Sequence, residues 1–101
     1  MTDRKAAKRP ERRTVTVAIT EGDFAGWEAV ALADFPARTL ERLQSSDMAT
    51  VMGAMDSIIV SHNLPDMDGN IAKAMSDVDP YEGAVAIASE VFDAIAKLPP
   101  R

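Results

Sequence analysis

The fold is decided by residues 14–43, TVTVAITEGDFAGWEAVALADFPARTLERL, where the spacing of apolar side chains changes once. Over Thr14–Ile19, valine and isoleucine alternate with threonine and alanine, which is typical of a strand with one buried face. Beyond Pro36 the apolar residues recur every three or four positions, which is typical of an α-helix. The change at Pro36 therefore predicts an N-terminal β-segment followed by a helical remainder.

The run from Ala25 to Ala33 fits two kinds of element. Read as a strand, it places Trp27, Ala29 and Ala31 on one face, but its other face is also partly apolar, so the pattern fits a helix as well. We favour a strand because it would complete a hairpin with residues 14–19. The preferred reading pairs the two runs as antiparallel neighbours.

Three helices follow from the spacing of apolar residues in the rest of the chain. The clearest signal is carried by Met48, Val51, Met52, Met55, Ile58 and Ile59. A second apolar face is formed by Val85, Ala88, Val91, Phe92, Ile95 and Leu98, and a first, shorter helix would point Leu40 and Leu43 inward. We therefore predict a mostly helical α+β domain, with a two-stranded antiparallel hairpin over 14–32 and helices near 36–44, 47–63 and 80–97.

The composition limits what the chain does. A length of 101 residues allows one domain, predicted over 14–101, and the absence of cysteine excludes disulfides and thiolate chemistry. No apolar run approaches the length needed to cross a membrane, and no secretory signal is present, so we expect a cytoplasmic protein.

Charge is distributed unevenly along the chain. Residues 1–13 hold six cations and two anions, whereas the remainder holds five cations and fourteen anions. We predict that residues 1–13 form a disordered basic arm, because they offer no apolar face to bury. The acidic body disfavours nucleic acid as a partner, and any such contact would have to come from the arm.

No catalytic, cofactor or metal site is expected. The single histidine, His62, lacks a serine and an acid placed to form a triad with it. Asp66 and Asp68 followed by Gly69 resemble part of a calcium loop, but Leu64 and Met75 occupy its first and last ligand positions. We therefore predict a protein that is not an enzyme.

A protein-binding role is the remaining expectation. An exposed tryptophan would be a binding anchor, and methionine gives adaptable apolar contacts. The candidate partner-binding residues are Trp27, Met48, Met52 and Met55, although each of them also fits a core position.

Several segments together resemble the small tail assembly chaperones of long-tailed bacteriophages. The resemblance is a diffuse pattern over residues 14–99, without one diagnostic motif. Its segments are Phe24-Ala25-Gly26-Trp27 through Asp34-Phe35-Pro36, Leu40-Glu41-Arg42-Leu43-Gln44-Ser45, Ile58 to Gly69, and Phe92 to Pro99.

The resemblance implies a helper that binds the tape measure protein, or another tail protein, during tail assembly in the bacterial host and is absent from the finished virion. Such proteins often also exist in a longer, frameshifted form. It implies no catalytic residue. Two alternatives stay open, namely a structural tail or head component retained in the virion and a small regulatory protein that uses its basic arm on nucleic acid. Homo-oligomer formation is also left open.

Overall fold

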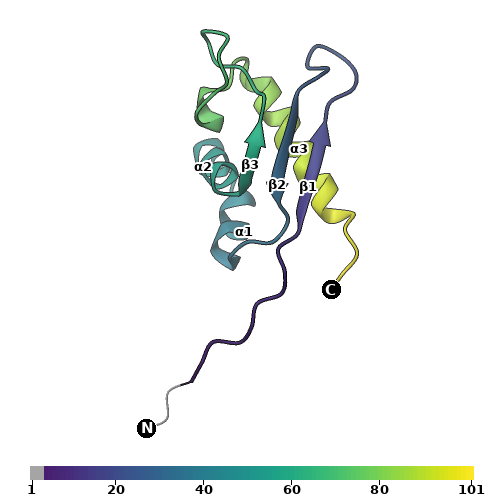
Figure 1. Cartoon of the computed structure of the whole chain (residues 1–101). Coiled ribbons are helices and arrows are strands. Elements are labelled where there is room, and N and C mark those ends of the chain that lie inside the picture. The colour runs from purple at the N-terminus through teal and green to yellow at the C-terminus, as the bar shows by residue number, and fades with distance from the viewer. Residues whose placement is uncertain (1–3) are drawn as a thin grey trace.

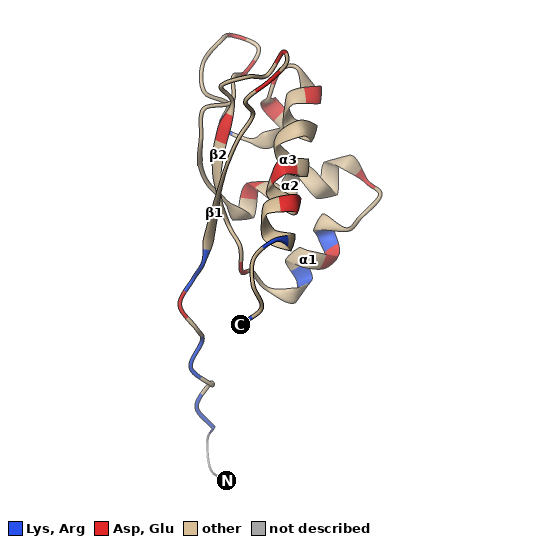
Figure 2. Ribbon diagram, turned by 90° about the vertical axis from the view of Figure 1, so that its right-hand side faces the viewer, with Lys and Arg blue, Asp and Glu red and all other residues tan. Residues whose placement is uncertain are grey.

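A computed structural model of the chain describes residues 4–101; residues 1–3 of the predicted arm lie outside the described residues. Three strands form one antiparallel sheet in the order β1-β2-β3, and the helices cover one of its faces (Figures 1 and 2). The elements are β1 (Thr14–Ala18), β2 (Glu28–Leu32), α1 (Ala37–Leu43), α2 (Met48–Ile58), β3 (Ile59–His62), the 3-10 turn η1 (Met75–Asp77) and α3 (Tyr81–Ala96).

The class is α+β, but the prediction of a two-stranded hairpin was wrong, because β3 adds a third strand beside β2. The predicted helix over 47–63 ends at Ile58. Its apolar spacing continues to Ile59, yet Ile59 and Val60 are β-branched and also suit a strand. Pairing with β2 decides between the two, and a register shift between Val30 and Ala31 accommodates the short strand.

Asn63 fastens the end of β3 to the start of β2. Its side-chain oxygen accepts a hydrogen bond from the Glu28 N–H at 2.8 Å, and its amide nitrogen donates to the Gly26 carbonyl at 2.9 Å. Gly26 adopts a positive φ of 91° in the turn that leads into β2, a conformation that glycine tolerates best. One amide side chain therefore holds the third strand and the β1–β2 turn together.

The core lies between the sheet and the helices. Val15 and Val17 of β1 face it, and so do Ala29 and Ala31 of the central strand. The small alanines leave room for larger side chains from the helical layer. The largest fully buried side chains are Met55, Ile58, Leu64, Met75, Ile87 and Val91.

Trp27 packs directly on α3 where that helix carries a glycine. A Cβ added at Gly83 would lie 1.8 Å from a ring carbon of Trp27, so the indole occupies the space of a missing side chain. The Phe24 ring supports the indole from the turn, with ring centroids 4.8 Å apart. This contact brings the first turns of α3 close to the sheet.

Asp34, just after β2, joins the two ends of the described chain. Its carboxylate accepts hydrogen bonds from the Arg13 N–H at 3.1 Å and from Arg101 at 2.7 Å. Arg9 and Arg12 lie within 3.7 and 3.6 Å of its other oxygen. Beyond these contacts, residues 4–13 form no helix or strand and extend away from the body (Figure 1).

The pKa of Asp34 reflects these partners. Desolvation alone would raise the pKa of this carboxyl, but the Arg13 N–H and the three surrounding guanidinium groups outweigh it and hold the pKa below its ordinary value of 3.8. A carboxyl whose pKa is lowered on folding stabilises the fold above its unfolded pKa, and that contribution is lost as the pH falls through the folded pKa.

We expect Asp34→Asn to unfold at a lower temperature than the parent chain at pH 7. The difference between the two unfolding temperatures should narrow as the pH falls below about 3.8, because the carboxyl of the parent chain then also becomes neutral. Thermal unfolding followed by circular dichroism at several pH values measures this. Asp23→Asn, in the β1–β2 turn, serves as the control. A difference that widens on acidification would contradict the assignment.

Gly83→Ala should destabilise the domain by about 1–3 kcal/mol, because the new methyl group collides with the Trp27 ring. Gly53→Ala is the matched control in α2. There the nearest atom to the added Cβ is the guanidinium end of Arg42, which can swing away. It should be neutral or stabilise by up to about 1 kcal/mol. Chemical denaturation measures the free energy of unfolding of both variants. Equal changes in the two would show that the contact between Trp27 and Gly83 is not tight.

Candidate protein-binding groove

α3 carries apolar side chains on more of its circumference than the sheet covers. Ala84, Ile87 and Val91 are buried. On another side of the helix, Tyr81 is 72% exposed, and Val85 and Phe92 are exposed by 39% and 36%. Tyr81, Val85, Ala88, Phe92 and Ile95 are spaced by three or four residues, so they form one stripe along the helix. We call them the α3 stripe.

The first turns of α2 and the inner side of α1 face this stripe. Met48 is 55% exposed at the start of α2, and Met52 lies one turn further on and is buried. Leu40 of α1 is 47% exposed. Two other helices therefore present apolar side chains around the same surface of α3.

Three hollows lie along the stripe and run into one another. The first, of about 270 Å³, lies between η1, α2 and α3. It shares Met48, Met52 and Val85 with the second, and the second shares Phe92 with the third, which lies against α1. We call the combined surface the α3 groove.

No charged side chain lines the α3 groove among the described residues. Its rim carries carboxylates. Glu82 and Asp93 are exposed on the solvent side of α3, one residue after Tyr81 and Phe92, and Asp47 precedes Met48 at the start of α2. The rim is therefore acidic on both sides.

Asp47 is held in place as the cap of α2. Its carboxylate accepts hydrogen bonds from the Thr50 hydroxyl at 2.6 Å and from the Thr50 N–H at 3.0 Å. The Thr50 hydroxyl, and then the Thr50 N–H, lower the pKa of Asp47, so this carboxylate keeps its negative charge at neutral pH.

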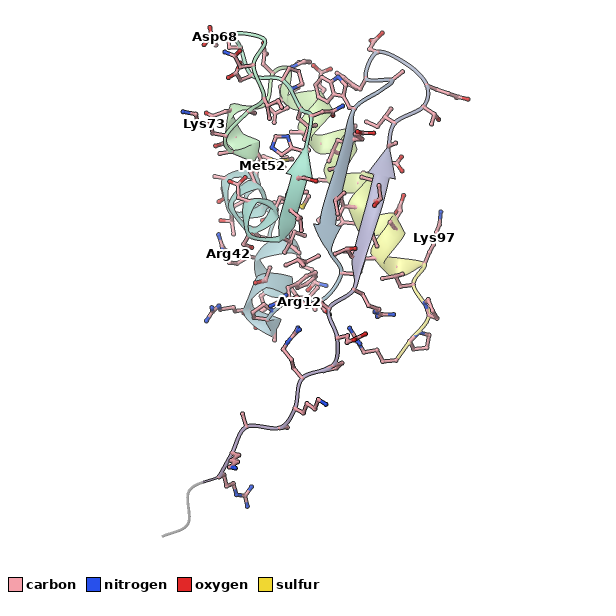
Figure 3. The ribbon with its side chains drawn as sticks, viewed as in Figure 1. Arg12, Arg42, Met52, Asp68, Lys73 and Lys97 are labelled. Carbon is pink, nitrogen blue, oxygen red and sulfur yellow. The ribbon has the colours of Figure 1, made fainter. Side chains whose placement is uncertain are left out.

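The nearby cations point elsewhere. Arg38 and Arg42 stand two residues from Leu40 on α1, which is about 200° around the helix, so they leave from its opposite side. Figure 3 shows Arg42 on the side of the molecule away from α3. Figure 2 shows acidic residues on α2 and α3, and basic residues in α1 beside an acidic one, in the N-terminal segment and at the C-terminal end of α3.

The four residues predicted to bind a partner do not come together. Met48 and Met52 lie at the groove, the former exposed and the latter buried as part of its floor. Met55 is fully buried in the core. Trp27 is half-buried and packs on Gly83, and it lines none of the three hollows.

Sequence reasoning missed the residues that make the groove. It placed Leu40, Val85 and Phe92 in the core, whereas the structure exposes each by at least 36%. Tyr81 was not singled out. The available signal was the number of apolar positions on the last helix, which exceeds what one buried stripe uses.

Other candidate sites have local explanations. The His62 ring nitrogen Nδ1 accepts a hydrogen bond from the Leu64 N–H at 3.0 Å, which ties it to its own turn. Asp66 accepts hydrogen bonds from the N–H groups of Asp68 and Asn70 and so closes the loop that contains them. Within residues 4–101, no group of three or more histidine, cysteine or acidic residues could hold a metal ion.

Comparisons with known proteins identify no relative. A scan against protein-family models, a search of curated proteins and a search of solved structures found no match to this chain. Within the described residues, no helix has the length and apolar character needed to cross a membrane.

Proposed function

We propose that this chain is a non-catalytic protein-binding helper that acts through the α3 groove. The observation that carries the proposal is the set of apolar side chains left exposed around one connected hollow surface by α1, α2 and α3. A contiguous exposed apolar surface with a polar rim is typical of a site that another protein covers.

The sequence resemblance to phage tail assembly chaperones supplies a partner for this proposal. We propose that the groove binds the tape measure protein during tail assembly in the cytoplasm of the bacterial host. The net charge of −5 supports a dispersing role, because a charged carrier resists association with its own kind. Exposed Met48 suits such a role, since a methionine side chain adapts to different apolar surfaces.

The test is co-expression with the tape measure protein encoded in the same genome, followed by co-purification. The Met48→Ser/Val85→Ser variant should reduce the recovered partner by about tenfold or more, because two apolar contacts are lost from the groove. The control is Val60→Ser/Met67→Ser. These side chains are 60% and 83% exposed but line none of the three groove hollows.

Two outcomes would reject the proposal. In one, the tape measure protein stays equally insoluble with and without this chain and nothing co-purifies. In the other, both double variants lose the partner to the same extent, which would show that the partner does not bind through the groove. Stoichiometric amounts of the chain in purified virions would favour a structural component instead.

A further inference from the structure

We propose that the α3 groove receives an amphipathic helix that is apolar along one stripe and flanked by lysine or arginine. This inference rests on the proposed function, because it specifies what occupies the same groove. It follows from the groove's walls, its length and the charge of its rim.

The walls favour a helix over an extended segment. The groove lies between helices and a 3-10 turn, whose main-chain N–H and C=O groups are largely bonded within their own elements. A partner strand needs free main-chain groups on a sheet edge, and the three hollows offer chiefly side chains. A helix instead meets the stripe with side chains at positions i, i+3, i+4 and i+7.

The stripe sets the length of the partner helix. Tyr81 and Ile95, at its two ends, are 14 residues apart on α3. At 1.5 Å per residue this corresponds to roughly 21 Å, or about four helical turns. A segment of about 15 residues would fill the groove from the η1 end to the α1 end.

The rim decides the charge of the partner. Asp47 stands on one side of the groove, and Glu82 and Asp93 stand on the other. No cation lines the groove among the described residues, and none of the ion pairs in this part of the chain involves Asp47, Glu82 or Asp93. Cations flanking the partner's apolar stripe would pair with both rims, whereas anions there would be repelled.

A second copy of the chain fits the groove poorly. Residues 14–101 hold five cations and fourteen anions, so two copies meeting through this face would bring acidic rims together. The chain's own basic segment is also unsuitable. Among residues 4–13 the only apolar side chains are those of Ala6, Ala7 and Pro10, and Arg9 and Arg12 lie against Asp34.

The probe is a pair of synthetic helical peptides of about 18 residues, long enough to span the stripe. Both carry leucine at one stripe of positions; one has lysine on the two flanks and the other has glutamate. Isothermal titration calorimetry with the full chain at low salt should show at least tenfold tighter binding of the lysine peptide. Raising the salt concentration should weaken it. Equal affinities would overturn the charge assignment.

Protein variants place the contact. Asp47→Asn/Glu82→Gln/Asp93→Asn should weaken binding of the lysine peptide about fivefold or more, and asparagine still caps α2. The control, Glu21→Gln/Asp23→Asn/Asp68→Asn, removes the same charge from loops that do not line the groove. It should change the affinity by less than about twofold. Equal losses in both triple variants would show non-specific attraction and overturn the inference.

The failure of this inference is distinguishable from the failure of the proposed function. If the tape measure protein co-purifies through Met48 and Val85 but neither peptide binds, the helical occupant is wrong and the function stands. If the lysine peptide binds in the groove but the tape measure protein does not co-purify, the groove accepts a basic helix and the proposed function is wrong. Sedimentation equilibrium tests for a dimer of the chain. A dimer that the Met48→Ser/Val85→Ser variant no longer forms would show that a second copy, and not a partner helix, occupies the groove.

Discussion

The contact between the Trp27 ring and Gly83 determines how α3 sits on the sheet. Because residue 83 has no side chain, the indole takes its place and the helix backbone approaches the turn that leads into β2. Tyr81 and Val85 each stand two residues from Gly83, which is about 200° around an α-helix. Pressing Gly83 against the tryptophan therefore turns both of these apolar side chains away from the sheet.

The narrow sheet adds a second constraint. Three short strands provide an inward surface built partly from alanines, and α3 packs chiefly against β1 while α2 continues directly into β3. The helical layer brings more apolar surface than this sheet covers. Met48, Leu40 and Phe92 remain at the seams between helices, where they border connected hollows. The groove is in this sense a product of the same packing that builds the core.

Much of the fold follows from local sequence patterns. The alternation of Val15 and Val17 with threonine predicts β1 and its buried face correctly, and Pro36 precedes the first helix as expected. The third strand could not be predicted in this way, since Ile58, Ile59 and Val60 suit the end of a helix as well as a strand. The strand forms there because it pairs with β2, which is distant in the sequence, and because the Asn63 side chain hydrogen-bonds to Glu28 and Gly26. Periodicity contains no information about such long-range pairing.

The groove was predictable only in part. Methionines at the start of α2 suggested an adaptable surface, and Met48 and Met52 do lie there. Whether Val85 faces the core or solvent depends on which of two adjacent apolar stripes the sheet covers. That choice is made by the contact between Trp27 and Gly83, which is a property of tertiary packing rather than of helical spacing.

Hydrogen–deuterium exchange of the full chain, with and without the co-expressed tape measure protein that we propose as its partner, tests the central claim most directly. The claim is that the partner is bound by the helical layer and not by the sheet or the basic segment. Slower exchange should appear in α3 and in the first turn of α2, while residues 4–13 and the loop around Gly69 exchange as before. Protection confined to β1, to the open face of the sheet or to residues 4–13 would contradict the account.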